Sequence, residues 1–531
     1  MADFYLRSAR ALHDITAQRS SIKAATAHTD RTAGGKSDAG DAKRMLALVV
    51  NTLSFREALQ TVLDKVAVAT HEQRWFGSAS RLNKEAAVGT GRRGTDARAA
   101  DAPVALTLAE CLLLVLTHDL LFATRGIQAA RAWPPRERLE KYRSQLHAEL
   151  VRLQLRRGKA RPEDLRSGAA ERRIAARIPR WCRVNTLKVS VEESVAQLRR
   201  LGWELTESDA LTSELEFAPS RHVPSVFAFH PRATSRLMGT QLFTTGGLIL
   251  QDLASCFPAA VLDPSRHEPS LDAAVALDAT SAPGNKTSHL SALMQGTGSL
   301  VALERAPNRY KTLVRLLGRA GCLAGRANAR GNVEPRKGDF LALQPTSLNP
   351  SAQYLLLDPS CSGSGIVNRL DYLTSQDDEQ DNLEQEVPEH SGGKRAAALA
   401  ARLSSLAALQ ERMVCHAMTF PELRRFTYST CSIHKEENEY VVCKALSSEE
   451  AKDGRWMLAP RADVLPTWPE RGHVDACGGD ERIAESMVRC TPGGRTACDE
   501  GVVLTEATNG FFVCCFVRKD AAHPAGELPH A

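Results

Sequence analysis

From about residue 263 onward, short apolar runs alternate with stretches whose apolar positions recur at helical spacing. This alternation predicts parallel strands joined by crossover helices, and therefore an α/β fold. The last apolar run, Phe511–Val517, follows the turn-forming pair Asn509-Gly510 and is predicted as half of a closing hairpin. The other predicted strands are 274–277, 300–303, 354–357 and 426–428, with helices such as 287–294 and 308–320 between them.

Residues 1–175 show a helical pattern instead, over 9–16, 46–68, 106–123 and 139–155. The stretches 26–41 and 77–103 are small, polar and rich in Gly, and are predicted as flexible insertions. The apolar segment 106–122 is shorter than the ~20 residues of a membrane span and is interrupted by charged residues. Because Thr107 and Glu110 match a capping box, we predict a buried helix there.

A small α/β module is predicted between these two regions. Its first strand is 181–185, its amphipathic helix 191–201 ends at Gly202, and Leu205 and 215–217 indicate further strands. The predicted domains are therefore 1–175, 176–262 and 263–520, followed by a tail at 521–531. Two insertions are predicted in the third domain, an acidic disordered one at 375–393 and a Gly- and Cys-rich one at 471–501. The second contains His473, Cys477, Cys490 and Cys498, whose spacing matches no standard zinc pattern, so no metal is expected.

Composition narrows the class of protein. The chain has 531 residues, 43% hydrophobic and 24% charged, which is ordinary for a soluble multidomain protein. The first residues show no signal-peptide pattern, so the 13 cysteines are expected to be reduced thiols. The net charge of +6 permits a polyanionic partner. The arginine-rich stretch 131–183 fits a solvated helix face and an RNA-contacting face equally well.

A Gly/Pro turn, 278–286, joins one predicted strand to the next helix. Ligands bind outside the carboxyl ends of strands in open α/β sheets, and a helix that begins there offers free amide groups. Glu304 ends the following strand, where a carboxylate can accept both hydroxyls of a ribose. Asp339 has the right place to meet an adenine amino group. Together these positions predict a nucleotide-type cofactor site.

Two cysteines, Cys361 and Cys431, each follow a predicted strand and lie among Ser, Thr and Gly. Most free cysteines are buried apolar residues, but a thiol at a strand end can face a cleft. Methylation of cytosine at carbon 5 needs a thiolate that adds to carbon 6, and a group that contacts the ring nitrogen. Either cysteine could supply the thiolate and Asp358 the contact, and the chemistry alone does not choose between the cysteines.

The ordered set of these motifs resembles the Sun-domain (Fmu-type) family of RNA cytosine-5 methyltransferases over most of 179–517. The set comprises Ala282-Pro283-Gly284-x-Lys286, Glu304, Asp358 with Cys361, and Thr430-Cys431-Ser432. The segments 183–188 and 251–255 also resemble this family. The segments 4–5, 117–121, 285–289 and 436–439 and Gly365 resemble its eukaryotic subgroup that acts on large-subunit rRNA, member five of the human set.

This resemblance implies a helical N-terminal region, an RNA-recognition-like module and a Rossmann-like domain that uses S-adenosylmethionine. It implies that Cys431 is the nucleophile, that Cys361 assists product release and that Asp358 lies close to the cytosine. Thr280-Ser281 replaces the usual Cys-Ala of the family, and Asn285 replaces a common Gly. The cofactor residues that it implies are Thr280, Ser281, Ala282, Pro283, Gly284, Asn285, Lys286, Glu304, Arg309, Asp339 and Asp358.

The expected partner is large-subunit rRNA in a pre-ribosomal particle, with no DNA and no membrane. The resemblance favours rRNA partly through Asn185. It implies a monomer in the nucleus and nucleolus. Two alternatives stay open: the same chemistry on tRNA or another RNA, and an rRNA-binding assembly factor without catalysis.

Overall fold

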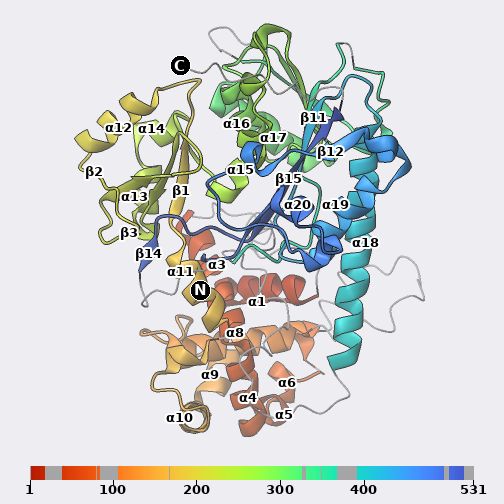
Figure 1. Cartoon of the computed structure of the whole chain (residues 1–531). Coiled ribbons are helices and arrows are strands. Elements are labelled where there is room, and N and C mark those ends of the chain that lie inside the picture. The colour runs from red at the N-terminus through yellow and green to blue at the C-terminus, as the bar shows by residue number, and fades with distance from the viewer. Residues whose placement is uncertain are drawn as a thin grey trace. The chain divides into compact units, whose positions relative to one another are not determined.

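The computed structural model describes residues 2–17, 25, 39–78, 80–83, 106–166, 168–325, 331–348, 350–367, 392–494 and 502–519. Two compact units are present, and among the described residues the division falls between 171 and 172 (Figure 1). The second unit contains both of the larger sheets. The three-domain division therefore stays a prediction.

The first unit is built from helices, as the apolar spacing predicts. The predicted stretch 46–68 is not one helix, because Ala67 adopts a left-handed φ of 55° and Phe55 separates two further segments. Most of the predicted insertions 26–41 and 77–103 lies outside the described residues, although α3 already begins at Ala39. The helices are α1 Ala2–Thr16, α3 Ala39–Ser54, α4 Arg56–Val66, α5 Val68–His71, α6 Gln73–Phe76, α8 Leu108–Phe122, α9 Pro134–Glu140 and α10 Arg143–Arg156.

The helix α8 is the buried helix that the sequence predicts. Thr107 accepts a hydrogen bond from the Glu110 amide at 3.3 Å, and the Glu110 carboxylate accepts one from the Thr107 amide at 2.7 Å. This confirms the capping box. Among the helices that the structure describes, none is long and apolar enough to cross a membrane. The arginines of α10 are exposed, as both interpretations of the basic stretch expect.

Tyr5 and Asp119 form a buried pair within this unit. The Tyr5 hydroxyl donates to Asp119 Oδ2 at 2.6 Å and accepts from the Gln128 amide at 2.8 Å. Burial, followed by the hydrogen bond to Asp119, raises the pKa of Tyr5. Tyr5→Phe would leave a buried carboxylate oxygen and a backbone amide without this partner. We expect a loss of about 2–3 kcal/mol in the stability of this unit, measured by urea unfolding. Phe4→Leu, which removes no side-chain hydrogen bond although it removes the ring under Arg44, is the control, and an equal loss in both variants would contradict this account.

The small module has the order of a ferredoxin-like fold. Its strands lie in the order β4-β5-β1-β6, with β2 added beside β4. The antiparallel pairing puts β1 in the centre, between β5 and β6. Its elements are β1 Arg180–Val184, α12 Val191–Arg200, β2 Glu204–Leu205, β4 Glu216–Pro219, β5 Val226–Phe229, α13 Thr234–Met238, α14 Gln241–Thr244 and β6 Leu248–Leu250. The helix α11, Ala169–Arg177, precedes it, and β3, Ala210–Leu211, pairs with β14, Val503–Leu504.

The large sheet has the order β12-β15-β11-β10-β7-β8-β9, and β13 also pairs with β15. The strands β8, β7, β10 and β11 are parallel, as predicted, and β9, which was not predicted from the sequence, adds a further parallel strand beside β8. Along the chain, β8 and β9 are added on one side of β7, and β10 and β11 are then added on its other side. The strand order therefore reverses between β7 and β10. The strands are β7 Val275–Asp278, β8 Ser299–Glu304, β9 Val333–Lys337, β10 Tyr354–Leu357, β11 Arg425–Thr430, β12 Trp456–Leu458, β13 Met487–Cys490 and β15 Phe511–Arg518.

Helices cover both faces of this sheet (Figure 1). Side chains alternate along each strand: Leu355 and Leu357 pack with α18 and α19, and Leu356 packs on the opposite face with α15, α16 and α17. This is why the strands read as continuous apolar runs. The helices are α15 Leu253–Leu262, α16 Asn285–Leu293, α17 Pro307–Ala320, α18 Gly392–Met418, α19 Glu439–Leu446 and α20 Glu481–Glu485.

The two predicted insertions differ in outcome. The acidic one lies outside the described residues, apart from Gly392 and Gly393 at the start of α18. The region 471–501 is not simply an insertion, because it supplies β13, whose apolar Met487 and Val488 are buried beside β15. Cys477 and Cys490 lie on separate elements, Cys498 is not described, and the described residues contain no group of three metal ligands. A long connection rather than a tight turn joins β13 to β15, and Asn509-Gly510 contacts Gly365 instead.

Candidate active site

The predicted site residues gather at the carboxyl ends of the parallel strands. Asp278 ends β7, Glu304 ends β8, and Asp358 and Cys431 directly follow β10 and β11. Since β7 and β10 are neighbours at the point where the strand order reverses, this is where open α/β sheets bind ligands.

The turn 279–286 is held from both sides. The Thr280 hydroxyl accepts from the Asp358 amide at 3.0 Å, and the Ser281 hydroxyl donates to the Leu303 carbonyl at 2.6 Å. Thus the two residues that depart from the usual Cys-Ala use their hydroxyls to bind the neighbouring strands. Gly284 has a φ of 112°, a left-handed value that favours glycine, and α16 begins at the next residue.

Glu304 is almost fully buried at the end of β8. Its Oε1 accepts from the Ala306 amide at 2.7 Å, and its Oε2 lies 3.5 Å from Arg309 Nε. Arg309 also donates to the Ala282 carbonyl at 2.7 Å, which links β8 to the turn. Asp339 is more exposed: it begins a short 3-10 helix by accepting from the Leu341 amide, and it pairs with Arg305 at 3.2 Å.

Lys286 is the centre of charge in the site. Its ammonium lies 2.9 Å from Asp358 Oδ2 and donates to Ser255 Oγ at 3.1 Å, and it lies 5.2 Å from the centre of the Phe511 ring. Burial disfavours its charge, but the Asp358 carboxylate outweighs burial, so the pKa of Lys286 is raised. Asp358 also accepts from the Ser429 hydroxyl at 2.8 Å. A lysine and a carboxylate are thereby fixed beside both cysteine loops.

The two predicted cysteines meet although 70 positions separate them. The Sγ atoms of Cys361 and Cys431 lie 3.1 Å apart, and both side chains are partly exposed. The hydrogen bond to Cys431, followed by burial, raises the pKa of Cys361 well above its usual range. Cys182, Cys256, Cys322, Cys514 and Cys515 are fully buried, as expected for apolar core residues.

The sequence interpretation assigned no site role to Gln410, Glu437 and Asn438, which hold the two cysteine loops. All three are fully buried. The sequence contained one indication of this role, because the acidic and amide residues 436–439 closely follow a cysteine motif. Such residues are ordinarily expected to be exposed, so the sequence did not predict their burial.

Known proteins support this picture at the level of sequence. Residues 259–388 match the model of the 16S rRNA methyltransferase RsmB/F family, and residues 178–251 match the ferredoxin-like domain of NOL1/NOP2/Sun domain family member 5. The 25S rRNA (cytosine-C(5))-methyltransferase of Schizosaccharomyces pombe is 32% identical over 493 residues, which covers 92% of this chain and 88% of that protein. The 28S rRNA (cytosine-C(5))-methyltransferase of Mus musculus is 34% identical, over 77% of each chain.

The chain belongs to the NOL1/NOP2/Sun-domain family of RNA cytosine-5 methyltransferases. This confirms the family that the motifs indicate, together with 5-methylcytosine formation in RNA. The crystal structure of PH0851 shares the fold, with a TM-score of 0.52 and 19% identity over 97% of this chain and 99% of that one. The Rossmann-like fold with a ferredoxin-like module and a helical N-terminal region is confirmed.

The methyl donor of this methyltransferase is S-adenosylmethionine, and its nucleoside part fits the residues at the strand ends. Each oxygen of Glu304 contacts one protein group and retains a lone pair, as a ribose diol requires. Gly284 stands at the N-cap of α16 and has no side chain that could accept hydrogen bonds from the first amides of that helix.

The motif 183–188 ties the module of the methyltransferase to the large sheet. Asn185 is fully buried and donates to the carbonyls of Gly246 at 2.9 Å and Ala320 at 2.7 Å. Arg183 is also buried and donates to Ser288 of α16 at 2.9 Å. Asn185 therefore cannot contact RNA directly, and its part in the resemblance reflects packing between the module and the sheet.

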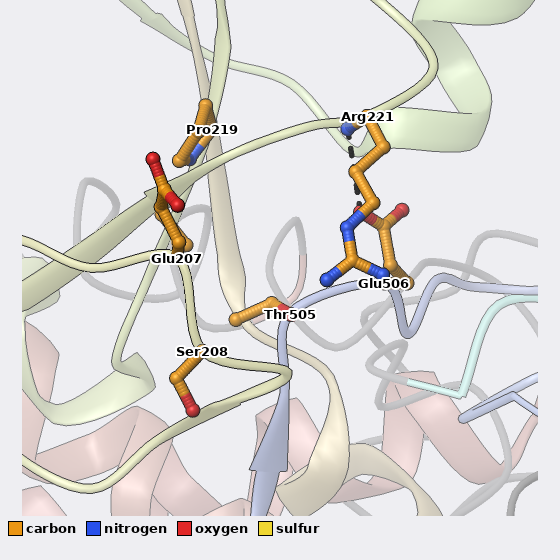
Figure 2. Close-up of a pocket in the computed structure, with 7 residues that line it drawn as sticks. Glu207, Ser208, Pro219, Arg221, Thr505 and Glu506 are labelled. Atoms are coloured by element: carbon orange, nitrogen blue, oxygen red, sulfur yellow. Dashed lines mark hydrogen bonds between the residues drawn. The ribbon is translucent and has the colours of Figure 1, made fainter.

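A pocket of about 250 Å³ lies elsewhere in the methyltransferase, between β4 and the segment after β14 (Figure 2). The Arg221 amide donates to Glu506 Oε1 at 3.3 Å there, and Glu207 lines another wall. None of its lining residues is a predicted site residue, and its two carboxylates disfavour a phosphate ligand. We do not connect this pocket with methyl transfer.

Asp278 makes a pH-dependent contribution to stability. Burial raises its pKa from 3.8 to about 6, although Thr287 and the Thr280 amide donate to it. Between these values the folded protein holds a proton that the unfolded chain releases, so this contribution to stability falls as pH rises from 3.8 to 6.

We expect Asp278→Asn to be about 1–2 kcal/mol more stable than the wild type at pH 7. The advantage should shrink towards pH 4, because Asp278 is then neutral in the folded protein and is also partly protonated in the unfolded chain. Urea unfolding of both proteins at pH 4, 5, 6 and 7 measures the difference. An advantage that does not change with pH would contradict the assignment.

Proposed function

We propose that this protein methylates carbon 5 of a cytosine in large-subunit rRNA, with Cys431 as the nucleophile and Cys361 as the thiol that assists release. The observation that carries the proposal is the contact of the two thiols at 3.1 Å beside the Lys286–Asp358 pair. The names of the fungal and mouse relatives specify 25S and 28S rRNA, which supports the choice of substrate.

The charges around the two thiols differ, and this difference supports the assignment of roles. A negative charge on Cys431 contributes to raising the pKa of Lys286, so the ammonium stabilises a thiolate at Cys431. A negative charge on Asp358 contributes to raising the pKa of Cys361. Cys431 therefore lies in the field of a cation, while the pKa of Cys361 is raised by its hydrogen bond to Cys431, by burial and by the nearby charges.

The reaction then uses the residues in a fixed order. Addition of the Cys431 thiolate to carbon 6 makes carbon 5 nucleophilic. S-adenosylmethionine, when bound, supplies the methyl group. Asp358 holds the cytosine ring through a proton that it shares with the ring nitrogen, which carries this proton while carbon 6 is bonded to sulfur, and Lys286 keeps Asp358 in place. Loss of the carbon 5 proton to a base lets the bond from carbon 6 to sulfur break, which releases Cys431 as a thiolate. We assign Cys361 to this last stage.

The remaining residues bind the methyl donor in this proposal. Thr280, Ser281, Ala282, Pro283, Gly284 and Asn285 line the turn, and the Glu304 carboxylate accepts the ribose hydroxyls while Arg309 holds the turn in place. Asp339 faces the adenine amino group. Asp339 also pairs with the exposed Arg305. When the adenine binds, the Asp339 carboxylate must therefore either release Arg305 or contact both groups.

The target cytosine must be unpaired or flipped out, because carbon 6 is inaccessible inside a stacked helix. We therefore propose action on an assembling pre-ribosomal particle, by a monomer, in the nucleus and nucleolus. The exposed arginines of α10 then contribute salt-dependent contacts to phosphates.

Bisulfite sequencing of large-subunit rRNA from cells with and without the protein tests the proposal. Loss of one methylated cytosine, restored by the wild-type protein and not by Cys431→Ala, is the expected result. An unchanged rRNA pattern together with loss of a mark in tRNA would contradict the proposed substrate but not the proposed reaction. Full rescue by Cys431→Ala would overturn the chemistry.

A further inference from the structure

Three consecutive polar residues, Glu437, Asn438 and Glu439, have no exposed surface at all. Acidic side chains are almost never this buried unless they are paired. Glu439 forms two contacts of 2.6 Å with Arg489, which donates to the Ile433 carbonyl at 3.0 Å. The other two residues reach the loops that carry the cysteines.

Asn438 bonds both neighbours of Cys431. Its Nδ2 donates to the Ser432 carbonyl at 3.0 Å, and its Oδ1 accepts from the Thr430 hydroxyl at 2.6 Å. One side chain thus holds both neighbours of Cys431, Thr430 through its hydroxyl and Ser432 through its carbonyl, while the Cys431 thiol contacts Cys361.

Glu437 does the same for Cys361, together with Gln410 of α18. Glu437 accepts from the Ser362 amide at 2.9 Å and from the Ser362 hydroxyl at 2.5 Å. Gln410 donates to the Ser360 carbonyl and to Glu437, both at 3.0 Å. The residues before and after Cys361 are therefore fixed by two side chains that also bond each other.

The two clamps are coupled because Glu437 and Asn438 are adjacent in sequence. Tyr428 of β11 donates to the Glu437 carbonyl at 2.5 Å, so both clamps are attached to the strand that leads to Cys431. The hydroxyls of Ser362 and Ser432 lie 3.2 Å apart and join the loops directly. These contacts account for the 3.1 Å distance between the thiols.

We propose that Asn438 and Glu437 are positioning residues with separate duties: Asn438 aligns Cys431 for addition to carbon 6, and the Glu437–Gln410 pair aligns Cys361 for release. This inference rests on the roles of the two cysteines under the proposed function. It adds the claim that each clamp serves one stage of the reaction.

The variants Asn438→Asp and Glu437→Gln separate the two duties. Asn438→Asp keeps the acceptor for Thr430 but opposes a carboxylate to the Ser432 carbonyl. Glu437→Gln keeps the shape and an oxygen for the Ser362 amide and Gln410, but it turns an amide towards the Ser362 hydroxyl and removes the negative charge that strengthens all three bonds. Each change perturbs one loop by a fraction of an ångström, and misplacement on this scale reduces rates by up to about 100-fold.

Two RNA substrates report the two stages. RNA with 5-fluorocytosine traps the Cys431 adduct, because carbon 5 has no proton to lose, and denaturing gels measure the rate of adduct formation. Ordinary RNA reveals slow release as accumulation of the covalent complex. We expect Asn438→Asp to slow adduct formation by about 10- to 100-fold without accumulation. We expect Glu437→Gln to form the adduct within about threefold of the wild-type rate and to accumulate it on ordinary RNA, which is also the expected result for Cys361→Ala.

The matched control is Asn332→Asp, the same change at another buried asparagine. Asn332 accepts from Ser291 at 2.7 Å at the amino ends of the strands, opposite the site. It should lower stability without changing the ratio of adduct formation to release. Thr430→Val removes the bonds of the Thr430 hydroxyl to Asn438 and the Ser432 amide, and Ser362→Ala removes those of the Ser362 hydroxyl, including the ones to Glu437 and Ser432. These two variants replace the main variants if those do not fold.

Equal slowing of both stages by Asn438→Asp and Glu437→Gln would overturn the inference and leave an ordinary structural role. Wild-type behaviour of both variants would overturn it too. Cys431→Ala and Cys361→Ala, run in parallel, test the proposed function itself: if Cys431→Ala still forms the adduct, the proposed function fails rather than the positioning.

Discussion

Cys431→Ala is expected to lower the rate of 5-methylcytosine formation by a factor on the order of 10³ or more, because loss of the nucleophile leaves only binding and orientation. The fold should be retained, since the Cys431 side chain is partly exposed and the loop is fixed through Thr430 and Ser432. Transfer of a radiolabelled methyl group to unmodified rRNA measures the rate. Binding of S-adenosylmethionine, measured by calorimetry, should stay within about threefold of the wild type.

Cys361→Ala is the matched control for this prediction, because it removes the other thiol of the pair. It should trap RNA on the protein rather than prevent attack. If Cys361→Ala prevents adduct formation while Cys431→Ala traps RNA, the two roles must be exchanged. Residual activity of Cys431→Ala near the wild-type level would exclude it as the nucleophile.

Lys286→Met should be the second most damaging change. It removes the cation that contacts Asp358 and Ser255 and leaves the Asp358 carboxylate with the Ser429 hydroxyl. We expect about a 100-fold loss of kcat, because Asp358 is no longer held and a thiolate at Cys431 loses its nearby positive charge. We also expect a loss of about 2 kcal/mol in stability, less than for a fully buried ion pair.

A double-mutant cycle with Asp358→Asn checks this prediction. The double variant should lose less stability than the two single variants together, because neither charge is then left alone. Its activity should not recover. The raised pKa of Lys286 adds a pH test: the pair stabilises the fold at neutral pH and loses this contribution only as pH rises above 10.5. Additive stability losses would show that the two groups do not interact.

The strands and most of the cofactor turn could be predicted because their signals are local. Continuous apolar runs mark strands that are covered on both faces, and Tyr354–Leu357 was predicted with the bounds that it has. The turn at 278–286 follows such a run directly, so its place at a strand end needed no tertiary information.

The clamps around the cysteines could not be predicted, because they depend on contacts across the sequence. Gln410 lies 50 positions from Ser360 and 27 from Glu437, and no local pattern pairs them. The place of β13 was missed for the same reason, since its partner β15 follows a Gly- and Cys-rich stretch that resembles an insertion. The stretch 46–68 is split at Phe55 and at the left-handed residue Ala67, and apolar periodicity reveals neither break.

The strand β15 lies between β11 and β12, so the last strand of the sheet covers the edge of the strand that leads to Cys431. On a translating ribosome β11 is made about 90 residues earlier, which at 5–20 residues per second is roughly 4 to 18 seconds. During this interval the apolar edge of β11 has no partner from the same chain, and such edges aggregate. A nascent chain that stalls before Phe511 should therefore depend on chaperones, and it lacks the Phe511 ring that lies beside the Lys286 ammonium, so the site is incomplete until synthesis has passed β15.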